Sequence, residues 1–179
     1  MEIALPGLET VVADARELPF PDESFDQVLL VSTLEHIGAD NDRYGSQGEP
    51  DDAGRAASLR ELRRILRPGG SLLVTVPLGE PGDHGWFRQE DVPGWTRLFT
   101  GAGFFVEELE AYELGDEGWR SAPTFDPQGV VYGTRGPAAS AVLCVELSPR
   151  RLRRLVSPDG VRRTARRRLG PRYRRLRGA

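Results

Sequence analysis

Two histidines, His36 and His84, are the side chains of this sequence best suited to moving a proton. His36 follows Ser32, Thr33 and Leu34 at the end of an apolar run. An imidazole can act as a general base, because imidazole side chains titrate near neutral pH. The sequence leaves open the alternative that His36 packs against its neighbours or caps the element that it starts.

The loop GEPGDHGWFRQED gathers side chains that suit a small-molecule substrate. It offers His84 as a base, Trp86 and Phe87 as aromatic walls, and Arg88 as a cation for an anionic group. Trp119 and Arg120, in DEGWRSAPTF, are predicted to complete the same pocket. An equally open interpretation is a surface loop that is held in place by aromatic packing.

An acidic residue, Asp14, ends a short β-branched run at residues 10–13. Such a run predicts a strand, and the carboxyl end of a parallel strand is where α/β sheets bind ligands. The alternative is an Asp that caps its loop by accepting hydrogen bonds from nearby backbone amides.

The elements that must position these residues follow an α/β pattern. Apolar runs predict strands at residues 10–13, 28–31, 71–76, 104–114 and 141–147, with a small extra strand at 129–132. Helical periodicity predicts helices at 56–66 and 89–102, with Pro68-Gly69-Gly70 as the turn after the first and a loop at 40–54. No helix separates the last two long strands, which indicates an antiparallel pair at the end of a mostly parallel sheet.

The composition favours a cytoplasmic protein with a buried core. The chain has 179 residues, of which 39% are hydrophobic and 28% charged. One cysteine, Cys144, and two histidines argue against a disulfide and against a cysteine- or histidine-built metal site. Neither a transmembrane run of about 18 apolar residues nor the basic start of a secretory signal is present.

The charge is distributed unevenly along the chain. Residues 1–147 carry 11 Arg and 26 acidic residues, whereas residues 148–179 carry 13 Arg and a single acid, Asp159. We therefore divide the chain into a domain at 1–147 and an Arg-rich tail at 148–179. The tail could bind RNA phosphates or an anionic membrane, but a terminal charge block is more commonly solvated. It could also fold back on the acidic domain.

Three blocks in this order resemble the second half of a class I S-adenosylmethionine-dependent methyltransferase with a type 11-like domain: VVADARELPFPDESFDQVLLVSTLEHIG, RELRRILRPGGSLLVTVP and LFTGAGFFVEEL. The matching residues are 8–114, and 141–147 take the place of the family's last strand. The resemblance implies a Rossmann-like sheet with an antiparallel last strand, and S-adenosylmethionine as the cofactor. It implies adenine contacts for the Asp14 carboxylate and the Ala15 backbone N–H. It places Ser32, Thr33 and Leu34 beside the methionine and sulfonium of the cofactor.

One family element is missing from the sequence. The family has an acidic, glycine-rich turn after its first strand, whose glycines let the backbone approach the cofactor. Only thirteen residues precede Asp14, and none form such a turn. We therefore expect an incomplete sheet. A truncated or misassigned start is the favoured explanation, and a degenerate fragment or a chain completed by a partner are the alternatives.

The function predicted from these observations is methyl transfer to a small-molecule or glycan-linked acceptor, by direct displacement at the sulfonium methyl. A base is needed only if the acceptor is a hydroxyl. One alternative is a non-catalytic methyltransferase-like module that forms a homo- or hetero-dimer through an exposed apolar strand at residues 28–31. The other alternative is an RNA methyltransferase that uses its basic tail.

Overall fold

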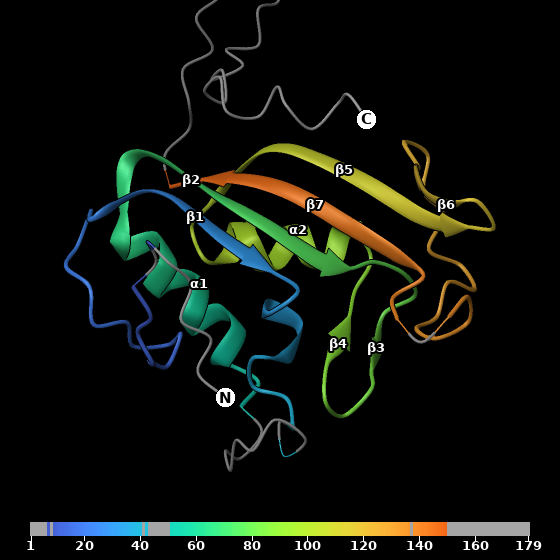
Figure 1. Ribbon diagram of the computed structural model, residues 1–179, viewed down its shortest axis with the longest axis horizontal. Helices are drawn as coiled ribbons and strands as arrows, with labels where there is room; N and C mark the ends of the chain where they lie inside the picture. Colours follow the sequence, from blue (N-terminus) through green and yellow to red (C-terminus); the bar gives the residue numbers. More distant parts are fainter. Residues whose placement is uncertain (1–6, 8, 41, 43–50, 137, 150–179) are drawn as a thin grey trace, which may run out of the picture.

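The computed structural model describes residues 9–40, 51–136 and 138–149, together with residues 7 and 42. Its main feature is a five-stranded sheet of order β1-β2-β7-β5-β6 (Figure 1). The strands are β1 (Phe25–Val31), β2 (Leu66–Pro77), β5 (Phe105–Gly115), β6 (Gly118–Ser121) and β7 (Ala141–Ser148). β1 and β2 are parallel, and β7 is antiparallel to both β2 and β5. Three of the four long strands thus run in one direction, which confirms a mostly parallel sheet with an antiparallel last strand.

Two helices cover one face of the sheet. They are α1 (Gly54–Ile65) and α2 (Val92–Gly101), and Figure 1 shows both on the same side of the strands. A short 3₁₀ helix, η1 (Leu34–His36), follows β1, and a small hairpin is formed by β3 (Gly82–Asp83) and β4 (Arg88–Gln89). Neither described helix is long and apolar enough to cross a membrane.

The core lies between the helices and the central strands. Alternate residues of β2 and β7 point toward the helices and are buried, as the two-residue period of a strand requires. They meet the apolar faces of α1 and α2. The buried side chains at this contact are Leu59, Leu62, Ile65, Leu72, Val74, Val76, Trp95, Phe99, Leu143, Val145 and Leu147.

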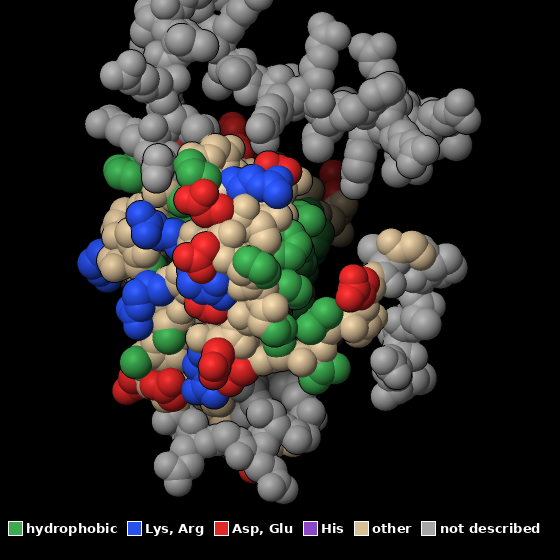
Figure 2. Space-filling view, turned by 90° about the vertical axis from the view of Figure 1, so that its left-hand side faces the viewer, with side chains coloured by type: hydrophobic (Ala, Val, Ile, Leu, Met, Phe, Trp, Pro, Cys, Tyr) green, Lys and Arg blue, Asp and Glu red, His purple; other side chains and the backbone are tan. Residues whose placement is uncertain are grey.

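β1 lies at an edge of the sheet, as the sequence indicated. Among the described strands, it pairs with β2 alone. Its Leu29 and Val31 side chains are 66% and 60% exposed, because they point away from the helices. Figure 2 views the molecule from the side on which β1 and α1 lie, and hydrophobic side chains are visible at this surface among acidic and basic ones. Association of two chains through this edge stays a prediction.

Two predicted strands are wrong. Residues 10–13 form no strand, and Val12 is 95% exposed, because no described strand lies beside them to pair with. A β-branched run forms a strand only when a neighbouring strand forms backbone hydrogen bonds with it. Residues 129–132 also form no strand, and the Val130 carbonyl instead accepts hydrogen bonds from the Glu80 backbone N–H and from Gln89 Nε2.

Several boundaries differ from the prediction by a few residues, and two of the differences have a clear physical reason. The register between β1 and β2 moves from Phe25↔Leu66 to Gln27↔Ser71, so that residues 67–70 form a bulge inside β2 rather than a turn before it. The helix predicted to begin at residue 89 begins at Val92, because the Asp91 carboxylate caps it by accepting the Gly94 N–H at 2.6 Å. Most of the predicted loop at 40–54 and the tail from residue 150 lie outside the described residues.

Candidate functional site

The chain turns sharply where β1 ends, at the carboxyl edge of the parallel strand pair. Ser32 has a φ of 45°, an uncommon value for a residue with a side chain. Its N–H donates to the Thr75 carbonyl of β2 at 3.0 Å, which holds the turn against the neighbouring strand. Ser32 and Thr33 are exposed at this edge, whereas Leu34 is fully buried. The structure therefore offers the two hydroxyls to a ligand, whereas neither the backbone nor the side chain of Leu34 is accessible.

His36 is held in a defined orientation by the hairpin. Its Nδ1 lies 2.9 Å from the Trp86 carbonyl oxygen, and the Trp86 ring stacks on the imidazole with 5.1 Å between centroids. Because a carbonyl only accepts hydrogen bonds, Nδ1 must carry the hydrogen. In the neutral ring, Nε2 is then the nitrogen that can accept a proton.

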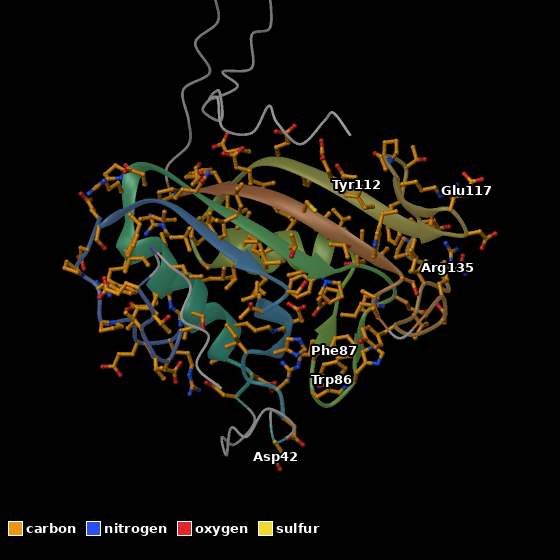
Figure 3. The ribbon with its side chains drawn as sticks, viewed as in Figure 1. Asp42, Trp86, Phe87, Tyr112, Glu117 and Arg135 are labelled. Carbon is orange, nitrogen blue, oxygen red and sulfur yellow. The ribbon has the colours of Figure 1, made fainter. Side chains whose placement is uncertain are left out.

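The rings of Trp86 and Phe87 lie beside His36 and belong to the hairpin, where Figure 3 shows both. We call His36, His84, Trp86, Phe87 and Tyr132 the aromatic cluster. His84 stacks on Phe87 at 4.5 Å, and Tyr132 lies 4.5 Å from Phe87 and 5.9 Å from Trp86. The sequence predicted four of these five residues as neighbours of a substrate or base, whereas nothing in it singled out Tyr132.

The aromatic cluster borders a hollow of about 310 Å³, a volume that would hold a small ring. Its lining is formed by Asp40, Asp42, His84, Gly85 and Trp86. Phe87 is only 1% exposed, so it supports the other rings from behind rather than forming a wall of the hollow.

Glu35 is a buried acid that the sequence analysis did not identify as a site residue. It is 5% exposed, and burial raises its pKa to about 7. Its Oε1 lies 3.9 Å from His36 Nε2, and no described residue forms a hydrogen bond with Oε2. A carboxyl group that titrates near neutral pH beside an imidazole can share a proton with it. Its burial depends on how η1 packs, which no local pattern shows.

Replacing Glu35 with Gln is expected to stabilise the protein above pH 7. In the unfolded chain the pKa of Glu35 is near 4.5, so between pH 4.5 and 7 the folded chain binds more protons than the unfolded chain. The free energy of unfolding therefore falls as the pH rises through this window. The amide cannot ionise, so Glu35→Gln should gain about 2–3 kcal/mol above pH 7 and nothing near pH 4.

Urea unfolding from pH 4 to pH 8 measures this difference. The exposed Glu117 provides the control, because Glu117→Gln should follow the wild-type curve at every pH. If the free energy of unfolding has the same pH dependence in Glu35→Gln and in the wild type, the prediction is wrong, because the pKa of Glu35 would then be the same in the folded and the unfolded chain.

Arg88 is already paired with carboxylates. Its guanidinium contacts Asp52 and lies 3.2 Å from Asp83, and these acids raise the pKa of Arg88. The side chain is 19% exposed. The predicted anion clamp therefore holds two acids of this chain, and it fastens the hairpin to the segment before α1.

The Asp14 carboxylate is likewise already paired within the chain, in this case with Arg16. It accepts hydrogen bonds from the backbone N–H of Arg16 at 2.8 Å and from Arg16 Nη2 at 2.7 Å. These bonds lower the pKa of Asp14. The arrangement matches the loop-capping alternative, so an adenine amino group would compete with Arg16 for Asp14, beside the half-buried Ala15.

Trp119 and Arg120 do not join the aromatic cluster. They line a separate hollow of about 880 Å³ together with Leu114–Gly118, Thr134 and Arg135. Figure 3 shows Glu117 and Arg135, which line this hollow, well apart from Trp86 and Phe87. The expectation of a shared pocket is wrong because β6 pairs with β5. This pairing places Trp119 on the edge strand opposite β1.

Comparisons with known proteins give consistent results. Residues 2–74 match a family model described as a methyltransferase domain. The ubiquinone/menaquinone biosynthesis C-methyltransferase UbiE of Hahella chejuensis is 32% identical over 117 residues, which are 65% of this chain and 41% of that protein. The demethylmenaquinone methyltransferase of Listeria welshimeri is 28% identical over 131 residues, or 68% of this chain and 45% of that protein. The chain thus spans less than half the length of these curated relatives.

The fold is shared with solved structures. The 1,6-didemethyltoxoflavin-N1-methyltransferase of Burkholderia thailandensis, solved with 1,6-didemethyltoxoflavin and S-adenosylhomocysteine, is similar with a TM-score of 0.51. The sequence identity is 19%, and the similarity covers 77% of this chain and 49% of that chain. At this identity the comparison establishes the fold alone.

Proposed function

We propose that the chain is a class I S-adenosylmethionine-dependent methyltransferase, because residues 2–74 match a methyltransferase domain and the relatives reported above are methyltransferases, and that the carboxyl edge of β1 and β2 forms part of a site that methylates a small molecule. The observation that carries this proposal is the placement of His36. Its proton-accepting nitrogen lies beside the buried Glu35, directly after the exposed turn at Ser32 and Thr33. Ligands of open α/β sheets bind at this edge of the strands.

The residues at this edge fit one side of the cofactor. Ser32 and Thr33 present hydroxyls to solvent at the end of β1 and would hold the methionine and sulfonium side. S-adenosylmethionine supplies an electrophilic methyl group on its sulfonium. Asp14 fits less well, because Arg16 occupies its carboxylate, and adenine binding there requires this pair to open.

The acceptor that best suits the site is a flat ring carrying a hydroxyl group. Trp86 and His84 offer ring faces for stacking at the hollow, and Asp40 and Asp42 offer carboxylates to a hydroxyl. The names of the two curated relatives point to quinone-type rings, which share this chemistry. Stacking faces favour such a ring over a glycan-linked acceptor.

His36 would act as the base of the reaction. As the acceptor gains the methyl group, it loses a proton from its hydroxyl or from the ring carbon, and Nε2 of His36 accepts that proton. The Trp86 carbonyl bonded to Nδ1 stabilises the imidazolium that forms. Stacking on Trp86 would restrict the orientation of the acceptor, and a fixed orientation lowers the barrier for a displacement.

The test is a transfer assay on the full chain with methyl-labelled S-adenosylmethionine. The acceptors are 1,4-dihydroxynaphthalene, naphthalene without hydroxyls, and a free hexose. Label in the dihydroxy ring alone is the expected result. Transfer to the hexose, or none to any acceptor by a folded chain, would contradict the proposal.

A further inference from the structure

Tyr132 is the member of the aromatic cluster that comes from outside η1 and the hairpin. It is half-buried in the segment that joins β6 to β7. Its ring meets the Trp86 ring edge-on, with 5.9 Å between the centroids and 88° between the planes, and its centroid lies 4.5 Å from that of Phe87. Tyr132 is not among the described residues that line the hollow of about 310 Å³, whereas Trp86 is. Tyr132 therefore acts on an acceptor in the hollow through Trp86.

The Trp86 ring is held from two directions. The His36 imidazole stacks on it at 5.1 Å with 25° between the planes, and Tyr132 contacts it nearly at a right angle. Both arrangements are among those that aromatic pairs prefer. Rotation of the Trp86 side chain would break both contacts, so the two neighbours fix the ring face on which an acceptor stacks.

Gln89 connects the segment of Tyr132 to the hairpin. It lies on β4, is 1% exposed, and its Nε2 donates hydrogen bonds to the carbonyl oxygens of Val130 and Glu80, each at 2.9 Å. Both partners only accept hydrogen bonds, so the amide nitrogen has to face them and the orientation of the side chain is fixed. Val130 comes two residues before Tyr132, so Gln89 sets the distance between that segment and the strand that follows Trp86.

A glycine allows this close approach. Val130 and Gln89 both lie against Gly79, where a Cβ would collide with the Val130 carbonyl oxygen and would lie 2.5 Å from Gln89 Nε2. Any other residue at position 79 would therefore push the segment away from the hairpin. The chain thus combines a buried amide donor with a glycine at the place where the segment of Tyr132 contacts the base of the hairpin.

We propose that Tyr132 is a positioning residue of the acceptor site. It fixes the Trp86 ring on which the acceptor stacks, and Gln89 fixes Tyr132 through the Val130 carbonyl. The effect on catalysis rests on the proposed function, whereas the effect on the Trp86 ring does not. Proton transfer does not depend on this contact, because His36 Nδ1 is bonded to the Trp86 backbone carbonyl rather than to the ring.

The KM for the acceptor tests this role in the full chain. Tyr132→Ala should raise the KM for 1,4-dihydroxynaphthalene about 2–10-fold, the range of one aromatic contact. Tyr132→Phe keeps the ring and should keep the wild-type KM. The rise should be the same with 2,4-dinitrophenol, which is ionised at neutral pH and needs no base. A purely structural role lowers the amount of active enzyme, so a fall in kcat at an unchanged KM, or an equal rise in KM for Tyr132→Phe, would overturn the proposal.

A double-mutant cycle tests the connection through Gln89. Gln89→Leu removes both donated hydrogen bonds and should raise the KM as Tyr132→Ala does, and the double variant should have the KM of Tyr132→Ala alone. Gln128→Leu, exposed in the same segment, is the control and should leave the KM unchanged. Effects that multiply in the double variant would show that Gln89 does not act through Tyr132. If Gln89→Leu does not fold, Gln89→Asn, whose side chain is one methylene shorter, replaces it.

An NMR measurement on the ligand-free chain needs no substrate. Gln89→Leu removes no aromatic ring, so a shift of the Trp86 indole signal reports a movement of the rings. We expect this shift in Gln89→Leu, none in Gln128→Leu, and no further shift when Gln89→Leu is added to Tyr132→Ala. A Trp86 signal that Gln89→Leu leaves in place would overturn the positioning role. A wild type that methylates neither ring, by contrast, would contradict only the proposed function.

Discussion

The His36→Gln variant is expected to transfer methyl groups to a hydroxylated ring about 10²–10⁴-fold more slowly than the wild type, the range lost with a general base. Glutamine can still donate a hydrogen bond to the Trp86 carbonyl, which His36 Nδ1 now contacts at 2.9 Å, but its amide cannot accept a proton. The measurement is the initial rate with methyl-labelled S-adenosylmethionine and 1,4-dihydroxynaphthalene.

The choice of acceptor separates a base from a packing residue. 2,4-Dinitrophenol is already fully ionised at neutral pH and needs no base, so wild type and His36→Gln should methylate it at similar rates. His84→Gln is the comparison variant, because His84 offers a ring face to the acceptor but is not the proposed base, so it should lose less activity than His36→Gln and lose it equally with both acceptors. A loss in His84→Gln that equals the loss in His36→Gln, or an equal loss with the ionised phenol, would show that His36 acts only through packing.

The Trp95→Ala variant is expected to lose about 3–5 kcal/mol of unfolding free energy, as other buried aromatic truncations do. Trp95 is fully buried between α2 and the sheet, stacks on Phe99, and donates its indole N–H to the Pro77 carbonyl at 2.9 Å. The substitution opens a cavity and leaves the carbonyl at the end of β2 without its partner.

Two further variants separate the contributions to this loss. Trp95→Phe keeps most of the ring and removes the indole donor, so it should cost about 1–2 kcal/mol. Trp119→Ala should stay within about 0.5 kcal/mol of the wild type, because Trp119 is 51% exposed. Urea unfolding at one pH compares all four proteins. Equal losses for Trp95→Ala and Trp119→Ala would contradict the assigned core.

The central strands and the first helix could be predicted from the sequence because their signals are local. The run at residues 71–76 is mostly apolar and is buried on its helix side, and the periodic leucines of α1 fall on one face. The run at 10–13 has equally good local signals and forms no strand, because strand formation also requires a neighbour in space.

Some neighbours in the candidate site could likewise be predicted from the sequence, and others could not. His84 and Trp86 are near neighbours in the chain, and the hairpin keeps them together, so their proximity was predictable. Trp119 lies more than thirty residues further on, and the pairing of β5 with β6 takes it to another hollow. The burial of Glu35 and the position of Tyr132 depend on tertiary packing, for which the sequence has no local signal.

The most direct test of the proposed site is an NMR titration of the ¹⁵N-labelled full chain with S-adenosylhomocysteine. The three tryptophans give three indole signals, with Trp86 at the proposed site, Trp95 in the core and Trp119 at the separate hollow. The proposed site predicts shifts in the backbone amides of Ser32 and Thr33 and in the Trp86 indole, with Trp95 and Trp119 unchanged. Shifts confined to Trp119 and its neighbours, or no shifts in a folded chain, would contradict it.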